Sequence, residues 1–263
     1  MTYCVGLRID RGLVFAADTR TNAGVDNVAV FRKMHVWEKP GERVLVILTA
    51  GNLAVTQAVV TLLNEAVDRE PETGQPSLAS ATTMFQAARL VGEAVREVKR
   101  VDGAALEAGG GFSASLILGG QIHGEPPRLF LVYSEGNFIE STKDTPFFQV
   151  GEHKYGKPIL DRVTRPEMRM ADAAKMMLLS FDSTIRSNLS VGMPIDLLIY
   201  RTDTLKVGEE RRIAAEDPYY RRLSRAWSEA LRDAFEHVDE YEDSTEETDP
   251  ADAPWPVTPA DTG

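Results

Sequence analysis

The chain has 263 residues, of which 43% are apolar and 26% charged, as in a soluble globular protein with one large domain or two small ones. It has no apolar run of roughly 18 residues and no basic or apolar leader at its N-terminus, so we expect a cytoplasmic protein outside the membrane. A single cysteine, Cys4, excludes an intramolecular disulfide framework and a cysteine-based zinc site.

The formal net charge of −11 is concentrated at the C-terminus. Residues 238–263 hold nine acidic residues and no lysine or arginine, which leaves a net charge of only −2 on residues 1–237. With its four prolines, this composition predicts a disordered tail at 238–263 after a folded domain at 1–237. The tail either keeps the protein soluble or docks a partner. No basic cluster with interleaved aromatic residues is present, so nucleic acid is not an expected partner.

The first half of the chain predicts four strands followed by two helices. Apolar runs at 2–9, 13–17, 34–37 and 44–48 are typical of strands, and the turn Asp10-Arg11-Gly12 joins the first two as a hairpin. Apolar residues then recur at helical spacing over 54–70 and over 84–102. We expect Glu70-Pro71 to stop the first helix and Asp102-Gly103 to end the second.

The second half predicts strands, two helices, a strand and a last helix. The strands lie at 113–118, 129–133, 138–139, 147–150 and 195–200, and the helices at 155–163 and around 174–185. Asp217 and Pro218 have the residue types that begin a final helix. Because the elements come in blocks instead of alternating, the order predicts an α+β fold in which antiparallel sheets are covered by helix pairs, in four layers.

Thr2 is the first residue with catalytic potential. It follows the initiator Met1 and is small enough that Met1 is normally removed, which gives Thr2 a free α-amine beside its hydroxyl. An α-amino group has a pKa of about 7.7–8.0, near enough to neutral to act as a base on that hydroxyl. Threonine is also common at this position as a plain strand start, so its meaning depends on the groups around it.

Asp18, Lys33 and Gly51 are such groups. Asp18 ends a buried strand run, where a charge requires a partner, and Lys33 lies between a polar stretch and a strand. A nearby ammonium lowers the pKa of a hydroxyl or amine, and an aspartate holds that ammonium in place. Gly51 lies where a strand passes into a helix, and its N–H can face a developing oxyanion. The four histidines form no close pair, so no metal or cofactor is expected.

These residues resemble the proteasome β-subunit family of N-terminal-nucleophile hydrolases. The similarity runs through Thr2, residues 13–20, Ala23-Gly24, Lys33 and residues 49–51. The spacing from Thr2 to Asp18 equals that of the family, and the spacing to Lys33 is one residue shorter. Within the family the sequence is most similar to the bacterial Anbu (ancestral β-subunit) proteins, through its start Met-Thr-Tyr-Cys and residues 18–26, Asp-Thr-Arg-Thr-Asn-Ala-Gly-Val-Asp. The resemblance covers residues 2–235 and implies an αββα sandwich.

The resemblance also implies a role for each matched residue. Thr2 is the expected nucleophile with its α-amine as general base, Lys33 lowers the pKa at Thr2, and Asp18 orients Lys33. The N–H of Gly51 is the expected oxyanion hole, and Thr49 is expected near the pocket for a substrate side chain. The edge that binds an extended peptide is expected to consist of Thr19, Arg20, Asn22 and Gly24.

Two motifs of the family are altered in this sequence. The Gly-Ser-Gly near the active threonine corresponds here to Gly151-Glu152-His153. The Asp-x-x-Ser-Gly motif corresponds to residues 187–192, where Ser187 replaces the supporting aspartate and Ser190 remains. We therefore expect Ser187 and Ser190 to support the site, with either weaker activity or an unusual substrate. We expect no propeptide before Thr2, so that activation needs only the removal of Met1.

The leading hypothesis is a proteasome-like threonine peptidase that acts on peptides or unfolded protein within a self-assembled homo-oligomer, a ring or an open spiral. The first alternative is an amidase for a peptide-like metabolite, and the second is a non-catalytic scaffold whose acidic tail binds a partner. Retention of Thr2, Asp18 and Lys33 together disfavours the scaffold, which needs none of them. The sequence has no ATP-binding loop, so unfolding of a substrate would require a separate ATPase.

Overall fold

The computed structural model describes residues 2–22, 28–107 and 111–241. The chain divides into two units, Met1–Arg225 and Ala226–Gly263. The first unit holds all the strands of the described residues and the helices that cover them, and the second begins within the last helix. Most of the predicted tail, residues 242–263, lies outside the described part of the chain.

Five antiparallel strands form the sheet that begins next to Thr2. The predicted turn at residues 10–12 joins two of these strands in a hairpin, and a third strand pairs with the far side of that hairpin. The order across the sheet is β10 (Phe147–Gly151), β1 (Tyr3–Ile9), β2 (Gly12–Asp18), β11 (Ile195–Arg201) and β12 (Glu209–Ile213).

A second antiparallel sheet lies against the first. Its order is β5 (Met34–Lys39), β6 (Arg43–Gly51), β7 (Ala114–Ile122), β8 (Arg128–Val132) and β9 (Phe138–Glu140). A short ribbon of β3 (Arg20–Asn22) and β4 (Val28–Val30) connects β2 to this sheet.

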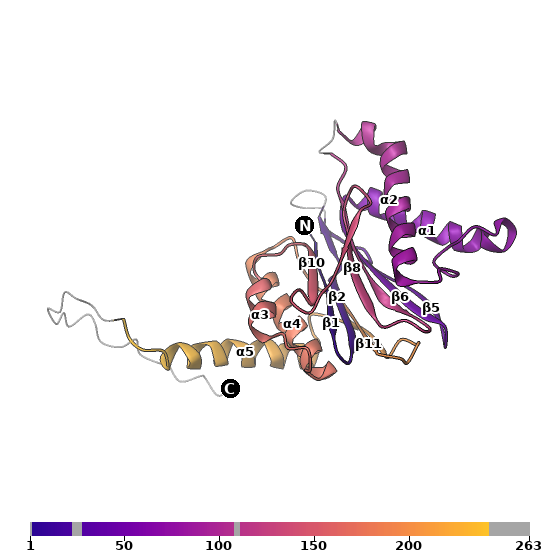
Figure 1. Ribbon diagram of the computed structural model, residues 1–263. Helices are drawn as coiled ribbons and strands as arrows, with labels where there is room; N and C mark the ends of the chain where they lie inside the picture. Colours follow the sequence, from indigo (N-terminus) through magenta and orange to yellow (C-terminus); the bar gives the residue numbers. More distant parts are fainter. Residues whose placement is uncertain (1, 23–27, 108–110, 242–263) are drawn as a thin grey trace. The chain divides into compact units, whose positions relative to one another are not determined.

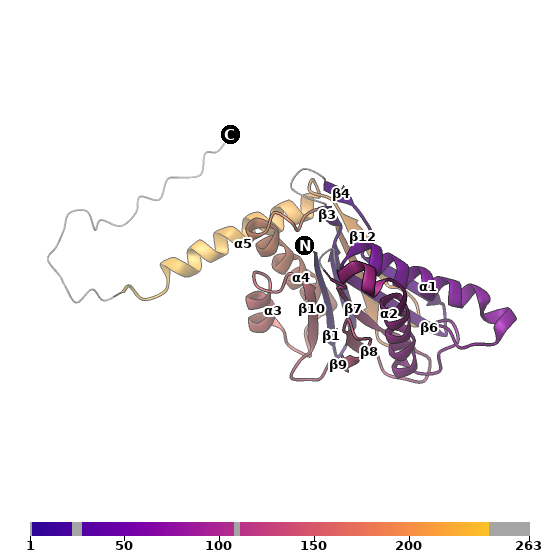
Figure 2. The ribbon, with the colours of Figure 1, turned by 90° about the horizontal axis from the view of Figure 1, so that it is seen from above.

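Helices cover the outer faces of both sheets (Figures 1 and 2). The pair α1 (Leu53–Thr73) and α2 (Met84–Glu107) packs on the second sheet. On the first sheet lies α4 (Met170–Ser187), with α3 (Lys157–Val163) beside it. The result is the four-layer α+β arrangement that the block order of the elements predicted, and it is the αββα sandwich that the resemblance to the N-terminal-nucleophile hydrolases implied.

Strand β6 shows how the sequence builds two cores at once. Val44, Val46 and Leu48 are buried in the core between the two sheets, whereas Leu45 and Ile47 are buried in the core under α1 and α2. Successive side chains of a strand point to opposite faces, so a strand buried on both faces is apolar throughout instead of alternating. The uninterrupted apolar run of β6 therefore places this strand in the middle of the sandwich.

Two predicted helix ends were wrong. Helix α1 continues through Pro71 to Thr73 and ends at Gly74, whose left-handed conformation (φ 66°) lets its N–H bond to the Glu70 carbonyl at 2.8 Å. A proline in the last turn removes one hydrogen bond without stopping the helix. Helix α2 likewise passes through Gly103, because a glycine costs only about 1 kcal/mol there and Leu106 beyond it packs against the core.

Three strands, β3, β4 and β12, were not predicted. Strand β12 is an edge strand in which only Ile213 is buried, so its sequence Glu-Glu-Arg-Arg-Ile carries no apolar alternation. Strands β3 and β4 flank the polar stretch after Thr19 and have three residues each. Strands this short pair through main-chain hydrogen bonds, and three residues are too few to show an apolar pattern from which a strand could be predicted.

The last helix, α5 (Pro218–Glu236), begins as predicted. The Asp217 carboxylate accepts the N–H of Tyr220 at 2.9 Å, as an N-terminal cap does, and Tyr220 is the buried residue of the helix. Within the second unit, Leu231 and Phe235 continue the apolar spacing but are exposed. Among the described residues, no helix has the combination of length and hydrophobicity needed to cross a bilayer.

Candidate active site

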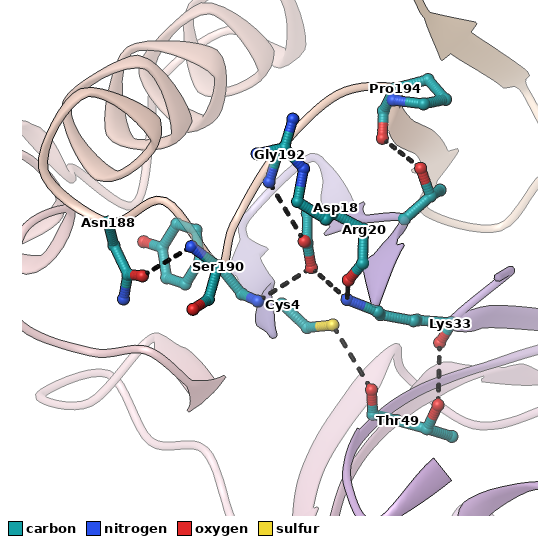
Figure 3. Close-up of polar contacts among 11 residues, drawn as sticks. Cys4, Asp18, Arg20, Lys33, Thr49, Asn188, Ser190, Gly192 and Pro194 are labelled. Carbon is teal, nitrogen blue, oxygen red and sulfur yellow. Dashed lines mark hydrogen bonds and ion pairs between the residues drawn. The ribbon is translucent and has the colours of Figure 1, made fainter. Parts of the chain in front are cut away.

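Asp18 and Lys33 form a buried ion pair at the end of the first sheet. Asp18 ends β2, Lys33 comes directly before β5, and Lys33 Nζ lies 2.6 Å from Asp18 Oδ1 (Figure 3). Asp18 is 0% and Lys33 3% exposed. Nζ also donates to the carbonyl of Arg20 at 2.6 Å. The sequence predicted that these two residues meet, and the structure brings them together.

The Asp18 carboxylate also holds two backbone groups. Oδ1 accepts the N–H of Tyr3 at 2.9 Å, and Oδ2 accepts the N–H of Gly192 at 3.3 Å. Burial raises the pKa of Asp18 above its usual value, and the Lys33 ammonium and both N–H groups oppose that rise. Because Tyr3 follows Thr2 directly, the carboxylate that binds the ammonium also fixes the chain next to Thr2.

Thr2 lies directly before β1 and is half-buried. Its carbonyl accepts the N–H of Glu152 at 2.6 Å. Gly151 packs against the same carbonyl with φ 83°, and a Cβ at this position would lie 2.0 Å from the Thr2 oxygen. Only glycine allows the end of β10 to approach Thr2 so closely. The main chain of Thr2 is therefore held by Asp18 through Tyr3 on one side and by residues 151–152 on the other.

Thr49 and Gly51 lie at the end of β6, beside Lys33. The Thr49 N–H donates to the Lys33 carbonyl at 2.9 Å, and Thr49 Oγ1 lies 3.4 Å from the same oxygen. Gly51 has φ 119°, and a Cβ there would lie 2.3 Å from the carbonyl oxygen of Ser113. The glycine is therefore required for the close approach of β7, in addition to the role that the resemblance implies for its N–H.

The loop from α4 to β11 packs against Thr19 and Arg20. The N–H and Oγ1 of Thr19 both donate to the Pro194 carbonyl, at 3.1 and 2.7 Å. The Arg20 guanidinium donates to the Leu189 carbonyl at 2.9 Å and lies over Gly192 so closely that a Cβ there would be 2.3 Å from its Cζ. These contacts fix the backbone that the resemblance assigns to substrate binding. Gly24 and the side chain of Asn22 lie outside the described residues.

The two predicted serines lie on the same loop region. Ser187 is the last residue of α4 and is exposed. Ser190 is half-buried, and its N–H donates to Oδ1 of Asn188 at 3.0 Å (Figure 3). Neither serine hydrogen-bonds to Asp18, which binds this loop through the N–H of Gly192.

Glu152 and Asn188 were not predicted as site residues. The sequence marked Glu152 only as a departure from the family pattern, yet it is just 5% exposed and bonds to Thr2 through its N–H. Its carboxylate accepts the N–H groups of His153 and Lys154, both at 2.8 Å, and Nδ2 of Asn188 at 2.7 Å. Burial acts to raise the pKa of Glu152, but these hydrogen bonds outweigh it and hold that pKa below its usual value.

Cys4 is buried beside the site, and burial raises the pKa of its thiol well above the usual value. Its Sγ lies 3.6 Å from the Thr49 carbonyl oxygen. The thiol is thus a packed core group. Within the described ranges, no group of three or more His, Cys, Asp or Glu residues is placed to hold a metal ion.

The geometry defines what the site can do chemically. Once Met1 is removed, Thr2 carries both a hydroxyl and a free amine. The next residue, Tyr3, is bound through its N–H to the Asp18 carboxylate, which also binds the Lys33 ammonium. An ammonium held without competing water favours deprotonated and oxyanionic species nearby, because charges interact more strongly in a low-dielectric surrounding. Such a site suits nucleophilic attack by Thr2 on a carbonyl.

Comparison with solved structures gives related proteins over almost the whole chain. Anbu from Hyphomicrobium sp. strain MC1, as a Gly-1 mutant, is 60% identical, with 92% of this chain and 100% of that chain covered and a TM-score of 0.86. Anbu (ancestral β-subunit) from Yersinia bercovieri is 46% identical over 91% and 98%, with a TM-score of 0.85. The Anbu complex from Pseudomonas aeruginosa, described as a helical assembly, is 45% identical over 93% and 100%, with a TM-score of 0.87. No protein-family model and no curated protein matches the chain.

Proposed function

The chain belongs to the Anbu (ancestral β-subunit) family, and from that premise we propose that it is a threonine-type N-terminal-nucleophile hydrolase that cleaves amide bonds in peptides. The observation that carries the proposal is the buried pair of Asp18 and Lys33, whose carboxylate also binds the N–H next to Thr2. Burying two charges costs desolvation free energy that apolar residues of similar volume would not cost, so stability alone does not account for this pair.

In the proposed reaction the Thr2 α-amine takes the proton of the Thr2 hydroxyl, and Oγ1 attacks the substrate carbonyl. Lys33 stabilises the developing negative charge, and the Gly51 N–H binds the oxyanion. The amine then protonates the leaving nitrogen as the C–N bond breaks. Water, activated by the same amine, hydrolyses the resulting ester and releases Thr2.

We propose that the peptide substrate lies extended along the β2–β3 segment. Thr19, Arg20, Asn22 and Gly24 would line the edge along which the peptide binds as an added strand. The Thr19 N–H already donates to Pro194 and the Arg20 carbonyl already accepts from Lys33, so these two groups would shape the edge and not bind the peptide. Thr49 would contribute to the pocket for the side chain before the cleaved bond. The bonds from Thr19 and Arg20 to the α4–β11 loop support this assignment, because they hold that edge in one conformation.

Hydrolysis of a library of fluorogenic tripeptides tests the proposal. The chain with Met1 removed is expected to release the fluorophore from at least one class of peptide, and Thr2→Ala to release none. Release that persists in Thr2→Ala would assign the activity to another group. Cleavage of amides of small peptide-like metabolites, with no cleavage of peptides, would instead favour the amidase hypothesis, which the altered residues around Glu152 and Ser187 also support.

We further propose that the chain self-assembles. The Pseudomonas aeruginosa relative forms a helical assembly, and the two chains align over 93% of this one. Light scattering coupled to size exclusion tests this point, because a strictly monomeric protein at micromolar concentration would contradict it.

A further inference from the structure

A closed circuit of hydrogen bonds passes through the main chain of Thr2 and Tyr3. One arm runs from the Thr2 carbonyl to the N–H of Glu152, and from the Glu152 carboxylate to Nδ2 of Asn188. The other runs from Tyr3, next to Thr2, through Asp18 to the N–H of Gly192. Both arms end on the segment between α4 and β11, which closes the circuit; Figure 3 shows the bond from Asp18 to Gly192 on that segment.

Glu152 is well suited to join two loops. Its Oε1 accepts the next two backbone N–H groups, which folds the chain after β10 into a turn, and its Oε2 is left for Asn188. A carboxylate has only acceptors, so three donors satisfy it without competition. Glu152 thus binds Thr2 through its N–H and Asn188 through its carboxylate.

Asn188 completes the connection from the other loop. It caps the C-terminal end of α4, where its N–H donates to the Thr184 carbonyl at 2.9 Å. Its amide uses both ends, since Nδ2 donates to Glu152 while Oδ1 accepts the Ser190 N–H at 3.0 Å. Only one orientation of the Asn188 amide satisfies both neighbours, because Glu152 needs a donor and the Ser190 N–H needs an acceptor.

We propose that Glu152 and Asn188 are positioning residues, which hold the Thr2 main chain at the angle at which its hydroxyl and amine meet the substrate carbonyl. The inference rests on the proposed function. A displacement of a reacting group by about 1 Å lowers a rate by as much as about a hundredfold.

Exchanging the two functional groups tests the bridge. In Glu152→Gln, a Gln amide N–H₂ faces the Asn188 N–H₂, so two donors meet. In Asn188→Asp, two carboxylates meet. In the double variant Glu152→Gln/Asn188→Asp, the Gln amide donates to the new carboxylate, which also accepts the Ser190 N–H, and the net charge equals that of the original chain. The matched control is Glu72→Gln, at an exposed glutamate on α1.

The readout is the labelling of Thr2 by a peptide epoxyketone in the full chain. We expect kinact to fall about ten- to a hundredfold in each single variant, with KI changed less than about twofold. The double variant should recover to within about threefold of the original chain, and Glu72→Gln should match it. An unchanged kinact in Glu152→Gln, or a folded double variant that labels no faster than the single variants, would overturn the proposal.

A second readout separates this inference from the proposed function. Amide hydrogen exchange of the segment 147–156 reports the Glu152 N–H whether or not Thr2 reacts. We expect faster exchange in both single variants and restored protection in the double variant. If the original chain is not labelled, the proposed function fails, and the bridge then stands only if the double variant restores protection.

Discussion

Lys33 Nζ and Asp18 Oδ1 are 2.6 Å apart, and both side chains are closed off from solvent. The same carboxylate binds the N–H of Tyr3 and the N–H of Gly192. One ion pair therefore joins the N-terminal strand, the segment before β5 and the α4–β11 loop. Each charge is compensated by the other, so removal of either affects stability and the site together.

Lys33→Met should destabilise the fold by about 3–5 kcal/mol, because it leaves the Asp18 carboxylate buried and without its cation. Lys157→Met is the matched control, since Lys157 pairs with Asp161 on the surface and contributes at most about 1 kcal/mol. Urea denaturation of each variant gives the two free energies of unfolding. Equal losses of unfolding free energy in the two variants would show that the buried pair contributes no more to stability than the surface pair.

Gly151→Ala should displace Thr2. Its Cβ would meet the Thr2 carbonyl oxygen at 2.0 Å, at a φ of 83°. Gly41→Ala isolates the backbone cost, because Gly41 has a φ of 80° with nothing within 4 Å of its Cβ. We expect Gly41→Ala to lower the free energy of unfolding by about 1 kcal/mol and to leave activity intact. Gly151→Ala should lower the free energy of unfolding further and abolish activity. Full activity of Gly151→Ala in peptide hydrolysis would contradict the geometry at Thr2.

Stability should fall in acid partly through Glu152. Its pKa is lowered in the folded chain, so its contribution is fully present above the unfolded value of about 4.3 and is lost as the pH falls through the folded value. Urea denaturation of the original chain and Glu152→Gln from pH 6 down to pH 3 measures this contribution as a difference. The difference should be largest at pH 6 and shrink below about pH 4.3. A difference that grows in acid would mean that the pKa is raised.

Cys4 should be unreactive in the folded protein. It is fully buried and burial raises the pKa of its thiol, so both access and thiolate formation are suppressed. A disulfide reagent such as DTNB at pH 8 should modify it at least about a hundredfold more slowly than in 6 M guanidinium. Rapid modification of the folded chain would show that the end of β1 opens to solvent.

The sequence predicted those site residues whose type and position alone indicate that they require a partner. Asp18 is a charge at the end of an apolar run, and the resemblance implied Lys33 as its partner although its spacing from Thr2 is one residue shorter than in the family. Glu152 could not be recognised in this way, because it reaches Thr2 through its N–H and its partner Asn188 lies 36 residues away on another loop. The pairing of two loops depends on the tertiary structure and leaves no local pattern.

The fold was predictable for a related reason. Apolar runs and helical spacing placed the layers correctly, since burial of those residues is what assembles the sandwich. Local stop signals were less reliable. Pro71 and Gly103 lie inside helices whose packing outweighs a weak local preference, and β12 has too few buried residues to show a strand pattern.

The measurement that tests the central claim most directly is mass spectrometry of the N-terminal peptide after incubation with a panel of peptide epoxyketones. These reagents form a ring with the hydroxyl and the amine of one residue, so they report both functions of Thr2 at once. We predict loss of Met1 and an adduct on Thr2 that is absent in Thr2→Ala and strongly reduced in Lys33→Ala. Retained Met1, or a free Thr2 that forms no adduct with any member of the panel, would contradict the account.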